Sequence, residues 1–133
     1  MKKTFKDPVC GLPIVIDCST VAEFRDEVCR RHIGIDCDDL DGNSGYCWTL
    51  GRREGGGTRI LVWINKDTWT VVHGPGTIAH ECFHALMFIN SMIYGTNELK
   101  LDSDQHEYAA YHLGNLYDMV WSVVARTIGK EKS

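Results

Sequence analysis

Continuous and alternating apolar positions predict three strands in the first half of the chain. Residues 12–17, 46–50 and 59–65 are rich in β-branched and aromatic residues. A glycine-rich connection joins the last two runs, so we expect them to pair as an antiparallel hairpin. The run 59–65 is apolar on both faces, which predicts a strand covered on both sides. Residues 69–73 are a candidate for one further short strand.

Helical spacing predicts a helix near each end of the chain. The first covers about residues 20–31 and begins with Thr20 and Glu23 in a capping-box pattern. The last covers about residues 104–127, starts at Ser103 or Asp104 and is expected to end at Gly129. Strands and helices in this order predict an α+β domain.

A third predicted helix carries the motif His80-Glu81-Cys-Phe-His84. Residues 74–76, Gly-Pro-Gly, are expected to break the chain before it, and Thr77 is a suitable N-cap. The residues that follow are mostly apolar, so this helix is expected to be nearly buried.

Histidines at i and i+4 lie on one face of a helix, so His80 and His84 can direct two imidazole nitrogens at one tetrahedral metal ion. Zinc with three protein ligands also binds water and lowers its pKa from 15.7 to about 7, and Glu81 would then act as general base. Two histidines and a glutamate are costly to bury unless a metal or hydrogen bonds satisfy them. The alternative is a chance motif whose histidines are only hydrogen-bonded.

A catalytic zinc ion needs a third protein ligand, and Glu107 in the last helix is the preferred candidate. Ala110, Tyr111 and Gly114 follow it at i+3, i+4 and i+7. Small residues on this face predict a close approach to the HExxH helix, which would explain a glycine inside a helix. The competing ligands are Asp104 and His106.

Composition narrows the remaining possibilities. The 133 residues, 44% of them hydrophobic, suit one compact domain spanning 1–133. A net charge of −4 without basic clusters gives no indication of nucleic-acid binding. No apolar signal region or transmembrane run is present, so we expect a soluble, cytoplasmic protein that does not enter membranes. The six cysteines contain no CxxC pair and are expected to be free thiols.

Two other patterns lead to no site. The acidic segment 36–45 fails as an EF-hand loop: with Asp39 at position 1, Ser44 stands where glycine is needed and Leu50 where glutamate is needed. A solvated loop is therefore expected there. Residues 7–11, Asp-Pro-Val-Cys-Gly, resemble the opening of a YHS metal-binding domain, but nothing downstream continues that pattern.

The segment Thr-Ile-Ala-His-Glu-Cys-Phe-His-Ala, followed two dozen residues later by Glu-x-x-Ala-Tyr-x-Leu-Gly, resembles the small zincin-fold proteins encoded in phages and prophages. These belong to the gluzincin side of the zinc peptidases. The likeness is clearest over residues 60–116. It implies a minimal zincin-like domain, in which a small, mostly antiparallel sheet packs on the HExxH helix and on a second ligand-bearing helix.

The resemblance also implies roles for single residues. His80, His84 and Glu107 would bind Zn²⁺, and Glu81 would be the catalytic base. Many gluzincins carry an aspartate four residues after the ligand glutamate, where this chain has Tyr111. Its hydroxyl could orient a ligand or donate to the oxyanion, and the residue could equally belong to the core.

The expected function is zinc-dependent hydrolysis of peptide bonds in a peptide or protein substrate. The substrate would add beside an edge strand, for which residues 59–65 are the candidate. The alternative is a phage-related structural or interaction protein that keeps a zinc-bound zincin fold without proteolysis. Glu81 favours the enzyme, because structural zinc has four protein ligands and needs no base.

Overall fold

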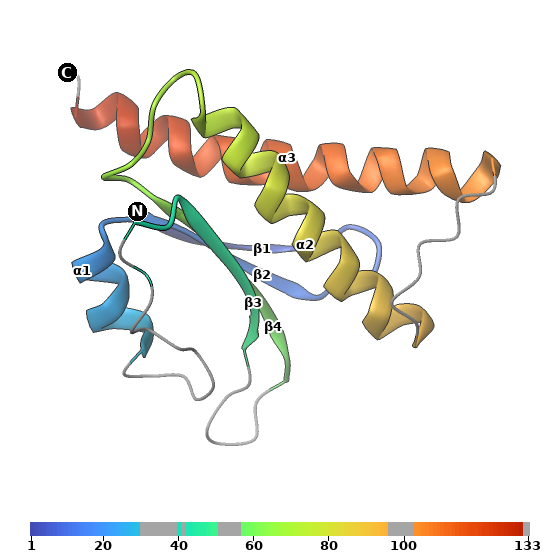
Figure 1. Ribbon diagram of the computed structural model, residues 1–133. Helices are drawn as coiled ribbons and strands as arrows, with labels where there is room; N and C mark the ends of the chain where they lie inside the picture. The colour runs from blue at the N-terminus through green and yellow to red at the C-terminus, as the bar shows by residue number, and fades with distance from the viewer. Residues whose placement is uncertain (30–39, 41, 51–56, 96–102, 132–133) are drawn as a thin grey trace.

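The computed structural model describes residues 1–29, 40, 42–50, 57–95 and 103–131. Two long helices cover one face of a four-stranded sheet, and a short helix lies against the other face (Figure 1). The strands are β1 (Lys2–Lys6), β2 (Pro13–Ser19), β3 (Gly45–Leu50) and β4 (Arg59–Asn65). The α+β class predicted from the sequence is confirmed.

The sheet is mixed, with strand order β1-β2-β4-β3. The hairpin predicted between β3 and β4 is confirmed, and Gly45 pairs with Ile64 at its open end. β1 pairs antiparallel with β2, whereas β2 and β4 are parallel. The suggestion that residues 59–65 form an edge strand is wrong, because β4 lies between β2 and β3. Among the described strands, β1 and β3 are the edges. The sequence analysis did not predict β1, whose lysine-rich sequence gives little apolar signal.

Side chains of β4 alternate between two apolar clusters, as the pleat of a strand requires. Ile60, Val62 and Ile64 face α2 (Gly74–Tyr94) and α3 (Ser103–Glu131). Leu61 and Trp63 face α1 (Val21–Phe24), which continues as the π-helical segment η1 (Arg25–Cys29). The ring of Phe24 stacks on Trp63 with centroids 4.7 Å apart. The prediction that this strand is covered on both sides is confirmed.

The helix with the HExxH motif begins at Gly74, earlier than the sequence suggested, and Thr77 is not its N-cap. Pro75 occupies the first turn, where its missing N–H removes no helical hydrogen bond. A Cβ on Gly74 would lie 2.4 Å from the Trp69 ring, so glycine permits the turn to pack there. Residues 69–73 contain no strand, and residues 71–73 form a turn. Gly95, with φ of 65°, ends the helix.

α3 starts where expected, at Ser103, but continues through Gly129 to Glu131. Its core stripe consists of Leu116, Val120, Val123 and Val124. The predicted small-residue contact with α2 is wrong, because Ala110, Tyr111 and Gly114 are exposed and a Cβ on Gly114 would meet no atom within 4 Å. The stripe that begins with Glu107 lies on the opposite side of the helix from the core stripe.

Among the described residues, no helix is both long enough and apolar enough to cross a bilayer. Of the acidic loop expected at 36–45, residues 36–39 and 41 lie outside the described part of the chain, as do residues 51–56 of the hairpin loop.

Candidate metal centre

His80 and His84 lie one turn apart on the solvent-facing side of α2. Their Nε2 atoms are 3.1 Å apart, and the side chain of His80 is 67% exposed. Two ligand nitrogens on a tetrahedral zinc ion, each 2.0–2.1 Å from the metal, are about 3.3 Å apart. The two imidazoles therefore have nearly the spacing that one shared ion requires. The expectation of a nearly buried helix is wrong for this face of α2.

His84 is suited to bind a metal at neutral pH. Partial burial and the neighbouring His80 lower the pKa of its imidazole from the ordinary value. A lowered pKa leaves the ring uncharged at neutral pH, and only the uncharged ring has a lone pair for a metal ion.

Glu81 lies between the histidine face of α2 and the sheet. It is buried, and its Oε1 is 3.9 Å from Nε2 of His80. Burial raises the pKa of this carboxyl to about 7, because the ionised form loses hydration. A carboxyl group with a pKa near 7 can accept and release a proton at neutral pH, which is the property of a general acid–base residue.

The first residue of β3 packs directly against Glu81. A Cβ on Gly45 would lie 2.9 Å from the Trp63 carbonyl oxygen and 3.0 Å from Cγ of Glu81. It would also lie 3.1 Å from the Thr77 methyl group. Only glycine therefore lets the edge strand approach the carboxylate without displacing one of these groups.

Two cysteines lie next to Glu81 and remain protonated. Burial, and then the charge of Glu81, raise the pKa of the Cys82 thiol to about 12, and the same two causes raise the pKa of the Cys47 thiol. Cys10, Cys18, Cys47 and Cys82 are free thiols, as predicted. The side chains of Cys29 and Cys37 lie outside the described part of the chain.

Glu107 and Tyr111 of α3 are the residues predicted to complete the site. Glu107 is exposed, and Tyr111 is 74% exposed. Within the described residues, no group of three or more His, Cys, Asp or Glu side chains is arranged to hold a metal. The side chains of Asp104 and His106 are not among those described. The structure thus brings together His80, His84 and Glu81, and the third ligand stays a prediction.

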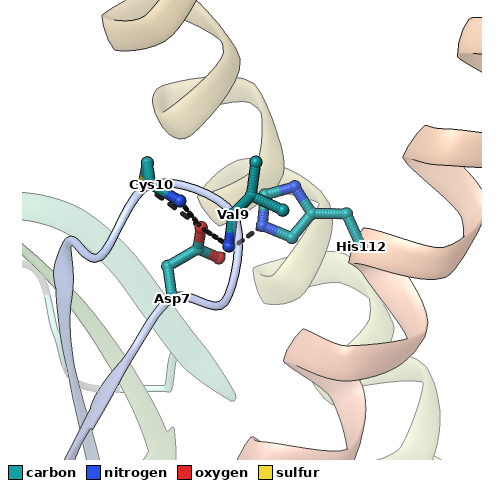
Figure 2. A network of polar contacts seen from close by, with 4 residues as sticks. All are labelled: Asp7, Val9, Cys10 and His112. Carbon is teal, nitrogen blue, oxygen red and sulfur yellow. Dashed lines mark hydrogen bonds and ion pairs between the residues drawn. The ribbon is translucent and has the colours of Figure 1, made fainter.

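A second polar cluster, which the sequence analysis missed, joins the turn after β1 to α3 (Figure 2). The Asp7 carboxylate accepts hydrogen bonds from the backbone N–H groups of Val9 and Cys10 and from the Cys10 thiol. Its other oxygen contacts Nε2 of His112 in α3. The side chains of Asp7 and His112 are 0% and 6% exposed, so a substrate cannot reach them. This cluster positions the two elements.

Hydrogen bonding keeps Asp7 ionised in spite of its burial. Burial by itself raises the pKa of the carboxyl, but the hydrogen bonds from Cys10 and His112 outweigh it, and the net pKa is lowered. The turn residues could have been predicted from Asp7, because aspartate accepts from backbone N–H groups two and three residues on. The contact of Asp7 with His112 could not have been predicted from the sequence, since 105 positions separate the two residues.

No family model, curated protein or solved structure matches this chain. The functional assignment therefore depends on the residues and geometry of the candidate metal centre.

Proposed function

We propose that this protein is a zinc-dependent metallopeptidase, a hydrolase of peptide bonds. His80 and His84 bind the metal through Nε2, Glu107 supplies the third ligand, and Glu81 is the general base. The observation that carries the proposal is the 3.1 Å separation of the Nε2 atoms of His80 and His84 on α2. The residue that follows His80 in this helix, Glu81, has a buried carboxyl group.

The donor set suits the chemistry. Zinc at this position would supply Lewis-acid activation of water and of a peptide carbonyl. Glu81 takes the proton from the attacking water and passes it to the leaving amine. The carboxyl group is placed for both transfers, because its Oε1 lies 3.9 Å from Nε2 of the proposed ligand His80.

Glu107 is proposed as third ligand from the resemblance to gluzincins, with Asp104 and His106 as the alternatives. The stripe of α3 that carries it faces solvent, so ligation needs the first turns of α3 to approach the histidine face of α2. Tyr111 lies one turn further along the same stripe. It would move with Glu107, so its hydroxyl could then orient a ligand or donate to the oxyanion.

The open edge of the sheet supports a peptide as substrate. In the described residues β3 pairs with β4 on one side only, so β3 is an edge strand of the described sheet. Gly45 at the start of β3 touches Glu81, which places this edge beside the proposed base. An extended peptide can add to such an edge as a further strand.

Metal analysis tests the site. After dialysis against zinc, the wild type should retain one equivalent, and His84→Ala should lose it. His73→Ala is the matched control, because His73 is also exposed and precedes the same helix. Zinc content unchanged in His84→Ala would refute the site. Glu107→Gln, compared with Asp104→Asn and with His106→Gln, identifies the third ligand as the variant that loses zinc.

Activity separates the peptidase from a structural protein that only keeps the metal. Glu81→Gln retains the size of the side chain but cannot accept a proton, so zinc and fold should persist while hydrolysis falls by about 10²- to 10⁴-fold. Unfolded proteins, peptide libraries and the protein itself serve as substrates, with a chelator as control. If the wild type cuts nothing that Glu81→Gln leaves intact, the structural alternative is correct.

A further inference from the structure

The histidine pair on α2 is an incomplete set of metal ligands on an exposed surface. His80 and His84 are both exposed, and their Nε2 atoms are 3.1 Å apart. Phe83 precedes His84 on the same helix and is 47% exposed. Within the described residues of one chain, no third His, Cys, Asp or Glu is arranged with the pair to hold a metal. Catalytic zinc needs three protein ligands, so one has to reach this face from elsewhere.

The first turns of α3 carry the preferred third ligand on their solvent side. Glu107 is exposed, and its neighbours Tyr108 and Tyr111 are 58% and 74% exposed. In Figure 1 these turns, drawn in orange, lie apart from the first half of α2, drawn in yellow-green. Aromatic side chains are enriched in the surfaces through which proteins associate. The carboxylate therefore lies on a surface suited to contact another chain.

The contact between Asp7 and His112 holds α3 in this orientation. Of residues 107–113, only His112 is buried, one turn before Leu116 of the core stripe. Glu107 precedes His112 by five residues, which places the two about 140° apart around the helix axis. Turning Glu107 toward α2 would pull His112 away and leave the Asp7 carboxylate buried without its imidazole partner, which is costly. Packing of α3 therefore opposes ligation within one chain.

We propose that Glu107 of a second copy of this chain completes the ligand set of His80 and His84. In a twofold dimer, the histidine face of each copy meets the first turns of α3 of the other, so the dimer has two identical metal sites. Phe83 on one surface and the two tyrosines on the other provide apolar contact. The inference deepens the proposed function and rests on it, because it names the source of the third ligand.

A second copy is the occupant that fits, because each surface supplies what the other needs. Two uncharged histidines leave a bound metal ion with its full positive charge, which attracts the carboxylate of Glu107. Both surfaces belong to the same chain, so a twofold dimer satisfies both at once and forms no open filament. Docking of a second copy also leaves the contact between Asp7 and His112 intact, whereas closure within one chain breaks it.

Sedimentation with and without zinc tests the dimer. With zinc, the wild type should sediment as a dimer that holds one metal ion per chain, and a chelator should return it to the monomer. Glu107→Gln should remain monomeric and lose zinc. His73→Ala is the control and should behave like the wild type, because His73 is exposed and precedes α2.

Complementation between two variants shows whether the ligands come from different chains. His84→Ala keeps Glu107 but lacks the histidine pair, whereas Glu107→Gln keeps the pair but lacks the carboxylate. Neither should retain zinc alone, but an equimolar mixture should regain up to about half an equivalent per chain, because one site of each mixed dimer is complete. The control mixture, His84→Ala with His80→Ala, should regain none. All three substituted residues are exposed, and circular dichroism checks that the variants fold.

The results that would overturn this inference act differently on the proposed function. A wild type that binds one zinc ion per chain as a monomer would show that the third ligand comes from the same chain, and the peptidase would stand. Failure of the two variants to complement, while the wild type binds zinc, would mean the same. Zinc retained by Glu107→Gln would remove this residue from the site. A wild type that binds no zinc would overturn the metal centre and both proposals.

Discussion

Replacing Asp7 with asparagine tests the buried cluster that joins the turn after β1 to α3. The substitution keeps the size and planar shape of the side chain but removes its charge. The Oδ2 atom of Asp7 accepts from both N–H groups and from the thiol, and an amide oxygen can accept the same bonds. An amide nitrogen then faces Nε2 of His112, so the bond between carboxylate and imidazole is lost.

The expected cost follows from the burial of the pair. A hydrogen bond to a charged group contributes about 1.5–3 kcal/mol, and side chains that are 0% and 6% exposed are little screened by solvent. We expect Asp7→Asn to lower the free energy of unfolding by about 2 kcal/mol at pH 7, out of a total of about 5–15 kcal/mol for a typical domain. Asp7→Ala should cost about 3–5 kcal/mol, because it also leaves two backbone N–H groups without their acceptor.

Urea unfolding followed by circular dichroism measures these differences at constant m value. The control is Asp118→Asn on the exposed side of α3, which should change stability by less than about 0.5 kcal/mol. A loss below about 0.5 kcal/mol for Asp7→Asn would refute the reasoning.

The same variant predicts a pH dependence with a definite sign. The folded-state pKa of Asp7 is lowered from 3.8, so its ionised form stabilises the fold fully above that pH. The contribution is lost as the pH falls through the folded-state pKa. The stability difference between wild type and Asp7→Asn should therefore be present at neutral pH and shrink once the pH falls below 3.8. A difference that is undiminished in acid would contradict the assignment to this carboxyl.

Three further outcomes follow from the packing. Gly45→Ala should cost about 1–3 kcal/mol in urea unfolding, because its Cβ would lie 2.9 Å from the Trp63 carbonyl oxygen; an unchanged midpoint would disprove the close contact. Phe24→Ala should cost about 3–5 kcal/mol, since the fully buried ring stacks on Trp63; a smaller loss would mean that the α1 side adds little to the core. All six thiols should react in denaturant without reductant, and Cys47 and Cys82 should react slowly in the native state because burial raises the pKa of both thiols. Fewer than six would reveal a disulfide.

Local patterns in the sequence determine the elements that carry the candidate site. The spacing of His80 and His84 places both on one helix face wherever that helix lies, because the 3.6-residue period is a property of the backbone. The hairpin of β3 and β4 was predictable for a similar reason, since its strands are neighbours in sequence and joined by glycines. The exposed position of the histidines was not predictable, because the apolar residues around them suggested burial.

Only the tertiary structure decided which strand is the edge and which face of α3 meets the core. The parallel pairing of β2 with β4 puts β4 inside the sheet, and this contact joins two strands that α1, η1 and β3 separate in the sequence. In α3, the sequence offered a small-residue stripe beginning at Glu107 and an apolar stripe that includes Val120. The apolar stripe that includes Val120 is the one that packs in the core, because stabilisation grows with the apolar surface removed from water and this stripe has the larger apolar area. Glu107 consequently faces solvent.

The sequence by itself determined the paired histidines, the adjacent carboxyl and the α+β class. The tertiary structure alone placed Gly45 against Glu81, Trp48 against Phe88 and His112 against Asp7. The physical reason is the range of the interactions: helix periodicity and hairpin turns act over a few residues, whereas these three contacts join different elements. Their partners are selected by the packing of the whole chain, and no local pattern records that selection.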